Sequence, residues 1–416
     1  MLIEKKNQIL NAFTIATQTT PVFHEIQNLQ PTGIFEGIKA IWFEGMDKGG
    51  DKTKVFAYIG FPDEALETEK VPAVVLLHGG GGHAFLCWVK MWNDRGYAAI
   101  AIDTTGYFPT AVNAGASENP ANWSYGVPSS IAETGYTSAP DKDNMRNSAG
   151  PLDNMWIYHA VGQAILAGNI LRADARVDSN KIGIVGISWG GVITSITIGY
   201  DVRFAFAVSI YGSGYLDEAK SSMRNNFSST ETQELWLAQE RFSKVKIPVL
   251  WLCWNDDKCF SINSNSKSYL DTVKNNVETR ISMISMMHHS HTHAWNRPES
   301  IAFADSIVKN GAKLTGLEKH PAGATVNVTL NVDPSATDVT AKLYYITSAM
   351  TYSNYDKFGT GTSTYMDQIW QTAELSVIDH TITGCIPTEA AGYYIEVKTT
   401  INGIEYITTS PYVELP

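Results

Sequence analysis

The chain has 416 residues, of which 44% are hydrophobic, and its 31 basic and 42 acidic residues give a formal net charge of −11. This length exceeds one ordinary domain, so two domains are expected. The acidic balance disfavours nucleic acid and anionic membranes as partners, and no stretch is long and apolar enough to span a bilayer.

The first predicted strands change in character along the chain. Residues 1–70 form a lead-in with two aromatic and β-branched segments, 38–43 and 54–59, which are typical of antiparallel strands. Residues 73–77 and 98–102 are instead almost continuously apolar, as expected for strands that are buried on both faces.

A long irregular segment interrupts the predicted elements. Residues 107–152 are rich in Pro, Gly, Ser and Asn, and their length predicts an insertion over the functional site. The elements that follow are a helix, four strands and a closing helix, predicted at 153–173, 182–187, 204–210, 249–253, 281–286 and 298–309. Strands that alternate with helices predict an α/β domain over 1–313 with a doubly wound, mainly parallel sheet.

Beyond residue 313 the pattern alternates with a period of two. The clearest alternating segments are 325–332, 342–346, 373–378 and 393–397. Asn402-Gly403, between two such runs, is a strong hairpin signal. Residues 314–416 are therefore predicted to be a small all-β, immunoglobulin-like sandwich. Packing against the first domain is its preferred role, and glycan binding is the alternative.

The motif Gly186-Ile187-Ser188-Trp189-Gly190 lies between a predicted strand and a helix-like run. A G-x-S-x-G at such a junction is typical of a nucleophile elbow. The turn strains the backbone of Ser188, and the two glycines leave room for it. Ser188 is therefore the predicted nucleophile, and the amide of Trp189 is expected to face a developing oxyanion.

A serine hydroxyl needs an imidazole to take its proton, and a carboxylate usually orients that imidazole. Asp256 and Asp257 directly follow a predicted strand, where ligand-facing loops belong. Asp257 is the preferred acid, because Phe260 is the apolar anchor that such loops tend to have. Asp256 is the alternative.

Residues 288–293 contain four histidines and follow the last predicted strand of the α/β domain. His291 is the preferred base because of its place in the loop and its small neighbours, and His289 is the alternative. Such a cluster also suggests a metal site. No carboxylate or cysteine at metal spacing accompanies it, however, and the four cysteines fit no metal pattern. No metal and no cofactor are expected.

The glycine-rich segment 78–83 follows the first buried strand. Glycines let a backbone approach the substrate closely and leave amides free to donate. Gly80 is predicted to supply the second oxyanion hydrogen bond, with Gly79 and Gly81 beside it.

Three aromatic residues of the insertion are candidate substrate contacts: Trp123, Tyr125 and Tyr136. Packing within the insertion is the preferred interpretation of these side chains.

The motifs HGGGGH, GISWGG, NDDKCF and HHSHTHAWNRPE occur in this order. With them, about the first 310 residues resemble the serine α/β-hydrolases. More narrowly, they are similar to acetyl xylan esterases, dienelactone hydrolases and prolyl-oligopeptidase-like enzymes. The resemblance also implies Asp257 as the acid. One departure is Trp254, which stands where many members of these families have glycine.

The main hypothesis is a serine carboxylic-ester hydrolase that forms an acyl-enzyme. Its expected partner is a small-molecule or carbohydrate ester with a short acyl group. The alternatives are a prolyl-oligopeptidase-like peptidase and a non-catalytic glycan- or protein-binding protein on the same scaffold. The N-terminal segment lacks the features of a signal peptide, so a cytoplasmic protein is expected unless the native start lies upstream. The oligomeric state stays open.

Overall fold

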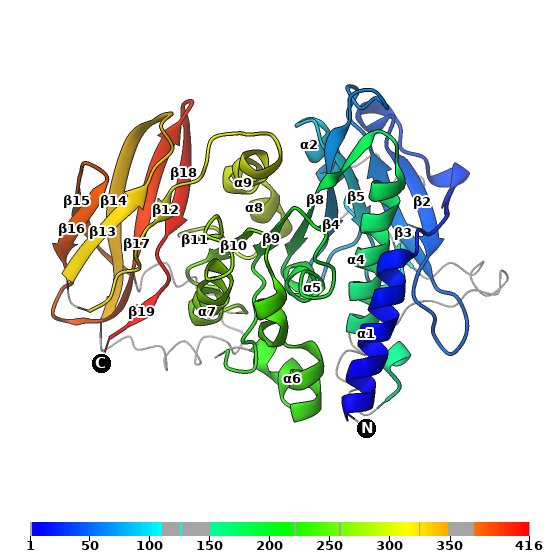
Figure 1. Cartoon of the computed structure of the whole chain (residues 1–416), viewed down its shortest axis with the longest axis horizontal. Coiled ribbons are helices and arrows are strands. Elements are labelled where there is room, and N and C mark those ends of the chain that lie inside the picture. The colour runs from blue at the N-terminus through cyan, green and yellow to red at the C-terminus, as the bar shows by residue number, and fades with distance from the viewer. Residues whose placement is uncertain are drawn as a thin grey trace. The chain divides into compact units, whose positions relative to one another are not determined.

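A computed structural model describes residues 2–109, 125–126, 150–219, 222–257, 259–323, 325–347 and 370–415 (Figure 1), with the backbone alone at 125–126 and 222. The chain divides into two compact units. The first comprises Met1–Ser209 and Asn226–Lys244, and the second comprises Ile210–Asn225 and Val245–Pro416. The all-β residues beyond 313 thus belong to the same unit as the last strands and helices of the α/β region.

The first unit contains a mixed sheet. Its strand order is β1 (Phe23–Glu25), β2 (Lys39–Glu44), β3 (Lys54–Gly60), β5 (Ala98–Ile102), β4 (Val71–Leu77), β8 (Val177–Ile187) and β9 (Phe206–Ile210). The pairs from β1 to β5 are antiparallel, whereas β4 pairs in parallel with both β5 and β8. Every residue of β4 and β5 is buried, as their continuous apolar character predicts. A separate two-stranded pair joins β6 (Phe108–Pro109) and β7 (Tyr125–Gly126).

The helices of the first unit are α1 (Leu2–Gln18), α2 (Leu86–Asn93), α4 (Trp156–Ala173), α5 (Trp189–Thr197) and α6 (Thr230–Trp236). Helix α4 is buried along almost its whole length, because α1 lies alongside it (Figure 1) and the sheet covers its other side. Asn169 ties the two helices together through hydrogen bonds to the carbonyls of Ala16 and Thr19. Only strands were predicted in the lead-in, so helix α1 is an element that the sequence analysis did not predict.

The second unit carries the parallel pair β10 (Val249–Trp254) and β11 (Arg280–Ile284) with helices α7 (Ile262–Val273), α8 (His291–Trp295) and α9 (Pro298–Val308). The hydroxyls of Ser261 and Ser290 cap the first turns of α7 and α8. Pro298 occupies the first turn of α9, where no backbone N–H is needed.

The C-terminal β domain is antiparallel. Its strands pair in the order β12 (Gly316–Leu317), β13 (Thr325–Asn331), β16 (Thr381–Cys385), β15 (Gln371–Ile378), β14 (Ala336–Thr347), β17 (Ala390–Ile401) and β18 (Ile404–Thr409), with β19 (Val413–Glu414) also on β17. Alternate residues of β13 are buried in one apolar core. Asn402 and Gly403 both have positive φ, 52° and 77°, and form the predicted hairpin turn between β17 and β18.

The predicted fold class, an α/β domain followed by a small all-β domain, is confirmed. Among the helices in the described parts of the chain, none combines the length and the apolar character that crossing a bilayer requires.

Candidate active site

Ser188 lies at the junction between β8 and α5. Its backbone has φ 57° and ψ −118°, a conformation that costs a non-glycine residue roughly 1–3 kcal/mol. The glycines on each side make this turn possible. A Cβ on Gly186 would lie 2.1 Å from the carbonyl oxygen of Gly190, and a Cβ on Gly190 would lie 2.1 Å from that of Leu77. The strand–serine–helix geometry is therefore that of a nucleophile elbow.

The glycine-rich loop after β4 lies directly against this elbow. A tight turn closes it, in which the amide of Gly82 donates to the carbonyl of Gly79 at 2.9 Å. A Cβ on Gly80 would lie 2.5 Å from the Trp189 ring, whereas one on Gly81 would meet no atom within 4 Å. The structure thus brings Gly80 and Trp189, the two predicted oxyanion donors, into contact.

His78 holds the start of this loop. Its Nε2 accepts from the amide of Thr104 at 3.0 Å, so the ring is neutral and its Nδ1 donates to the carbonyl of Gly79 at 2.7 Å. The hydroxyl of Thr104 also lies 3.1 Å from Nε2. This bridge between the ends of β4 and β5 fixes the loop from behind.

Asp103, at the end of β5, is fully buried next to the same loop. One carboxylate oxygen accepts from the amide and hydroxyl of Thr105, and the other lies 3.2 Å from Nδ1 of His83. Burial alone would raise the pKa of Asp103, but the groups around its carboxylate, foremost the hydrogen bond from His83, outweigh burial, and the pKa lies below its ordinary value. Sequence reasoning missed this residue, whose signal is its place at the carboxyl end of a buried strand.

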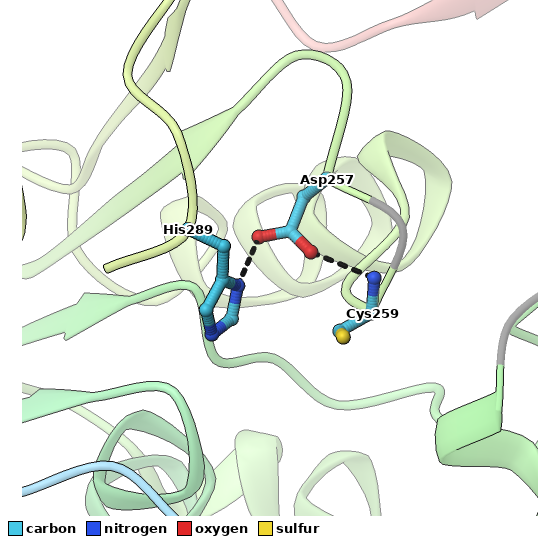
Figure 2. Close-up of side chains that lie close together, drawn as sticks. All are labelled: Asp257, Cys259 and His289. Atoms are coloured by element: carbon cyan, nitrogen blue, oxygen red, sulfur yellow. Dashed lines mark hydrogen bonds and ion pairs between the residues drawn. The ribbon is translucent and has the colours of Figure 1, made fainter. Parts of the chain in front are cut away.

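Asp257 and His289 form a close pair in the second unit (Figure 2). Nδ1 of His289 donates to one oxygen of Asp257 at 2.7 Å. The other oxygen accepts from the amides of Cys259 and Phe260 at 2.7 and 2.9 Å. The Asp257 side chain is fully buried, whereas that of His289 remains 23% exposed. Such a carboxylate holds the imidazole in the tautomer in which Nδ1 carries the proton and Nε2 is the basic nitrogen.

Two aromatic rings hold the imidazole of His289 in its plane. Tyr211 stacks on it with ring centroids 4.5 Å apart, and Phe260 stacks with centroids 5.8 Å apart. The Tyr211 hydroxyl donates to the carbonyl of His288 at 2.6 Å. Burial and the nearby Asp257 charge raise the pKa of Tyr211, which keeps this donor neutral. Phe260 was predicted as an anchor of the acid loop, whereas Tyr211 was not expected to take part.

Residues 55–314 match the dienelactone hydrolase family. The chain belongs to this family. No curated protein matches it significantly. The resemblance found in the motifs is confirmed at this level, and the α/β part has the hydrolase fold of the family.

Three solved structures are similar to this chain at low sequence identity. Acetyl xylan esterase from Paenibacillus sp. R4 aligns with a TM-score of 0.50 and 16% identity, over 73% of this chain and 94% of that one. Acetyl xylan esterase 1 from Thermoanaerobacterium sp. JW/SL YS485 aligns with a TM-score of 0.46 and 16% identity, over 68% of this chain and 86% of that one. Pyrococcus horikoshii acylaminoacyl peptidase aligns with a TM-score of 0.45 and 16% identity, over 66% of this chain but only 42% of its own length. At such identity, the likeness to the Paenibacillus enzyme concerns the fold alone.

The structure places His289, the alternative base, against Asp257, the preferred acid, whereas it places the preferred base His291 in helix α8. His288 has a positive φ of 46°, and the turn there directs residue 289 back to the acid loop. Ser290 then caps α8, which places His291 in the first turn of that helix with its ring 6.2 Å from Trp295. Asp256, the alternative acid, accepts instead from Nε1 of Trp370 at 2.8 Å.

Cys259 lies beside the Asp257–His289 pair (Figure 2). One potential ligand atom from each of the three residues falls within 4.8 Å of the others. The spacing of cysteines along the chain did not predict this, because the acid loop and the histidine loop are distant in sequence. In the present arrangement both Asp257 oxygens and Nδ1 of His289 already take part in hydrogen bonds.

The candidate substrate contacts of the insertion fall in parts of the chain with little description. Trp123 and Tyr136 lie outside the described residues, and Tyr125 is described by its backbone alone, in β7.

Proposed function

We propose that this member of the dienelactone hydrolase family is a serine carboxylic-ester hydrolase with Ser188 as nucleophile, His289 as base and Asp257 as the orienting acid. The buried carboxylate on Nδ1 of His289 carries the proposal, because it equips the imidazole to take a proton at Nε2. The proposal is also supported by the strained elbow at Ser188 and by the family match, which spans Ser188, Asp257 and His289.

In the proposed reaction, Oγ of Ser188 attacks the ester carbonyl carbon and its proton passes to Nε2 of His289. The amides of Trp189 and Gly80 stabilise the negative charge on the carbonyl oxygen. His289 then protonates the leaving alcohol, and an acyl-enzyme remains. Water deprotonated by His289 attacks this ester, and the acid product leaves with Ser188 restored.

The proposed substrate is a short acyl ester of a carbohydrate or of a similar small alcohol. The support is the fold likeness to an enzyme described as an acetyl xylan esterase. Rates on p-nitrophenyl acetate, butyrate and octanoate and on acetylated xylo-oligosaccharide test it, with preference for acetate expected. Faster turnover of aminoacyl-nitroanilides would favour the peptidase alternative.

The test of the reaction class is hydrolysis of p-nitrophenyl acetate by the wild type and Ser188→Ala. The substitution is expected to lower kcat by about three orders of magnitude or more. Ser213→Ala is the matched control, since Ser213 is a buried serine outside the elbow. Equal rates for the wild type and Ser188→Ala would refute the proposal, and a fluorophosphonate probe should label the wild type at Ser188 alone.

A further inference from the structure

The C-terminal β domain makes two buried hydrogen bonds to the loop that carries Asp257. Nε1 of Trp370 donates to Oδ1 of Asp256 at 2.8 Å, and Nδ2 of Asn255 donates to the hydroxyl of Tyr394 at 3.1 Å. All four side chains are buried. The two residues that precede the proposed acid are therefore each fixed by a side chain from beyond residue 313.

The two donor and acceptor rings are themselves held rigidly within the β domain. Trp370 packs edge-on against Tyr394, with ring centroids 5.1 Å apart, and against Tyr412 at 6.3 Å. Tyr344 stacks on Tyr394 at 5.0 Å with an interplanar angle of 7°. Because Tyr394 lies on β17, which is hydrogen-bonded between β14 and β18, these rings form a stiff platform and not a loose surface contact.

Strand β18 contacts the elements that flank His289. The carbonyl of Ile407 accepts from the hydroxyl of Ser282 at 2.7 Å, and its amide donates to Glu299 at 3.0 Å. The Thr409 hydroxyl accepts from the amide of Met283 at 3.3 Å. Ser282 and Met283 belong to β11, which leads to the histidine loop, and Glu299 begins α9. One domain thus supports both sides of the acid–histidine pair.

The two adjacent aspartates of this buried loop have different partners. Asp256 is occupied by the indole of Trp370, while Asp257 accepts from His289. Removing the indole donor would leave a buried carboxylate oxygen with one donor fewer, which is costly enough to shift the loop. A shift of about 1 Å at a catalytic group can lower the rate a hundredfold.

We propose that the C-terminal β domain is a working part of the active site, in which Trp370 and Tyr394 are positioning residues that aim Asp257 at His289. The proposal rests on the proposed function for its effect on catalysis. Its effect on the order of the acid loop is independent of that function.

The test compares Trp370→Phe and Tyr394→Phe with Tyr393→Phe. Tyr393 neighbours Tyr394 and is equally buried, but its hydroxyl donates to Gly323 at 3.1 Å within the β domain, so it is a matched control. The first two variants should lower kcat on p-nitrophenyl acetate about tenfold to a hundredfold with KM nearly unchanged. They should also speed hydrogen exchange at the amides of Cys259 and Phe260, which bond to Asp257. The control should do neither.

Asp256 variants approach the same contact from the other side. Asp256→Asn keeps an oxygen that can accept from Trp370 and should retain most of the activity, whereas Asp256→Ala should resemble Trp370→Phe. The double variant Trp370→Phe with Asp256→Ala should lose no more than either single variant, because both remove one shared bond.

Two results would overturn the proposal. In the first, Trp370→Phe and Tyr394→Phe show the same hydrogen exchange and the same kcat as the control. In the second, their hydrogen exchange is faster but their kcat is unchanged. Ser188→Ala in the same assay separates the two proposals. If the wild type is no faster than Ser188→Ala, ester hydrolysis is wrong. The exchange data then still decide whether the β domain orders the loop.

Discussion

At the scale of single residues, the site depends on backbone conformations that few side chains can adopt. Ser188 and His288 both have positive φ, 57° and 46°. Ser188 lies in the turn between β8 and α5, and His288 lies in the turn that precedes His289. The first presents the serine hydroxyl beyond the end of β8, and the second returns His289 to Asp257. In the proposed site, these two turns determine which side chains face the substrate.

The choice between the two histidines gives a direct prediction. His289→Ala should lower kcat on p-nitrophenyl acetate about a thousandfold or more, because Asp257 then has no imidazole to orient. His291→Ala should stay within about threefold of the wild type, since its ring packs near Trp295 in α8. Loss of turnover in His291→Ala with an active His289→Ala would restore the original assignment.

The two middle glycines of the oxyanion loop should also behave differently. Gly80→Ala places a methyl group 2.5 Å from the Trp189 ring and should lower kcat about a hundredfold by shifting an oxyanion donor. Gly81→Ala meets open space and should leave kcat nearly unchanged. Steady-state kinetics of the pair checks this, with thermal melting to show that both variants fold. Equal kcat values would remove Gly80 from the proposed oxyanion hole.

At the scale of elements, helix α4 contains a buried histidine, His159, which is expected to limit stability in acid. Nε2 of His159 donates to the carbonyl of Asp153 at 2.6 Å, and its buried Nδ1 has no hydrogen-bond partner among the described residues. Burial lowers the pKa of His159 to about 4, against the pull of the Asp153 carbonyl. A proton on Nδ1 would be buried without an acceptor.

The free energy of unfolding should therefore depend on this residue between about pH 4 and pH 6.5. In that window the unfolded chain binds a proton at residue 159 that the folded chain does not, so stability rises with pH, by on the order of 3 kcal/mol in total. His159→Gln should flatten the dependence. Urea unfolding at several pH values measures it, and an unchanged slope in the variant would contradict the assignment.

At the scale of the whole molecule, the all-β segment makes extensive contacts with the last strands and helices of the α/β region. It shares a compact unit with β10, β11 and α7–α9, and its hydrogen bonds reach Asn255, Asp256, Ser282 and Glu299. The sequence pattern changes at residue 314, but the second compact unit contains residues on both sides of that position.

A chain cut after Lys313 should consequently fail to form a native second unit. The cut leaves buried polar groups of β11, α9 and the acid loop without their partners, and each such group costs about 1–3 kcal/mol. Near-UV circular dichroism of the truncated chain should be weak compared with the full chain. A truncated chain with a native spectrum and full esterase activity would show that the β domain is dispensable.

The sequence alone determined the fold class, the strand–serine–helix turn at Ser188 and the hairpin at Asn402-Gly403, because each follows from local sterics or from the period of burial along a strand. It narrowed the acid and the base to two residues each. Only the tertiary structure shows which side chains of these pairs meet, since the turn with positive φ at His288 and the indole of Trp370 separate the two members of each pair. The roles of Tyr211, Cys259 and Asp103 were likewise hidden, because contacts between residues far apart in the chain leave no pattern in local spacing.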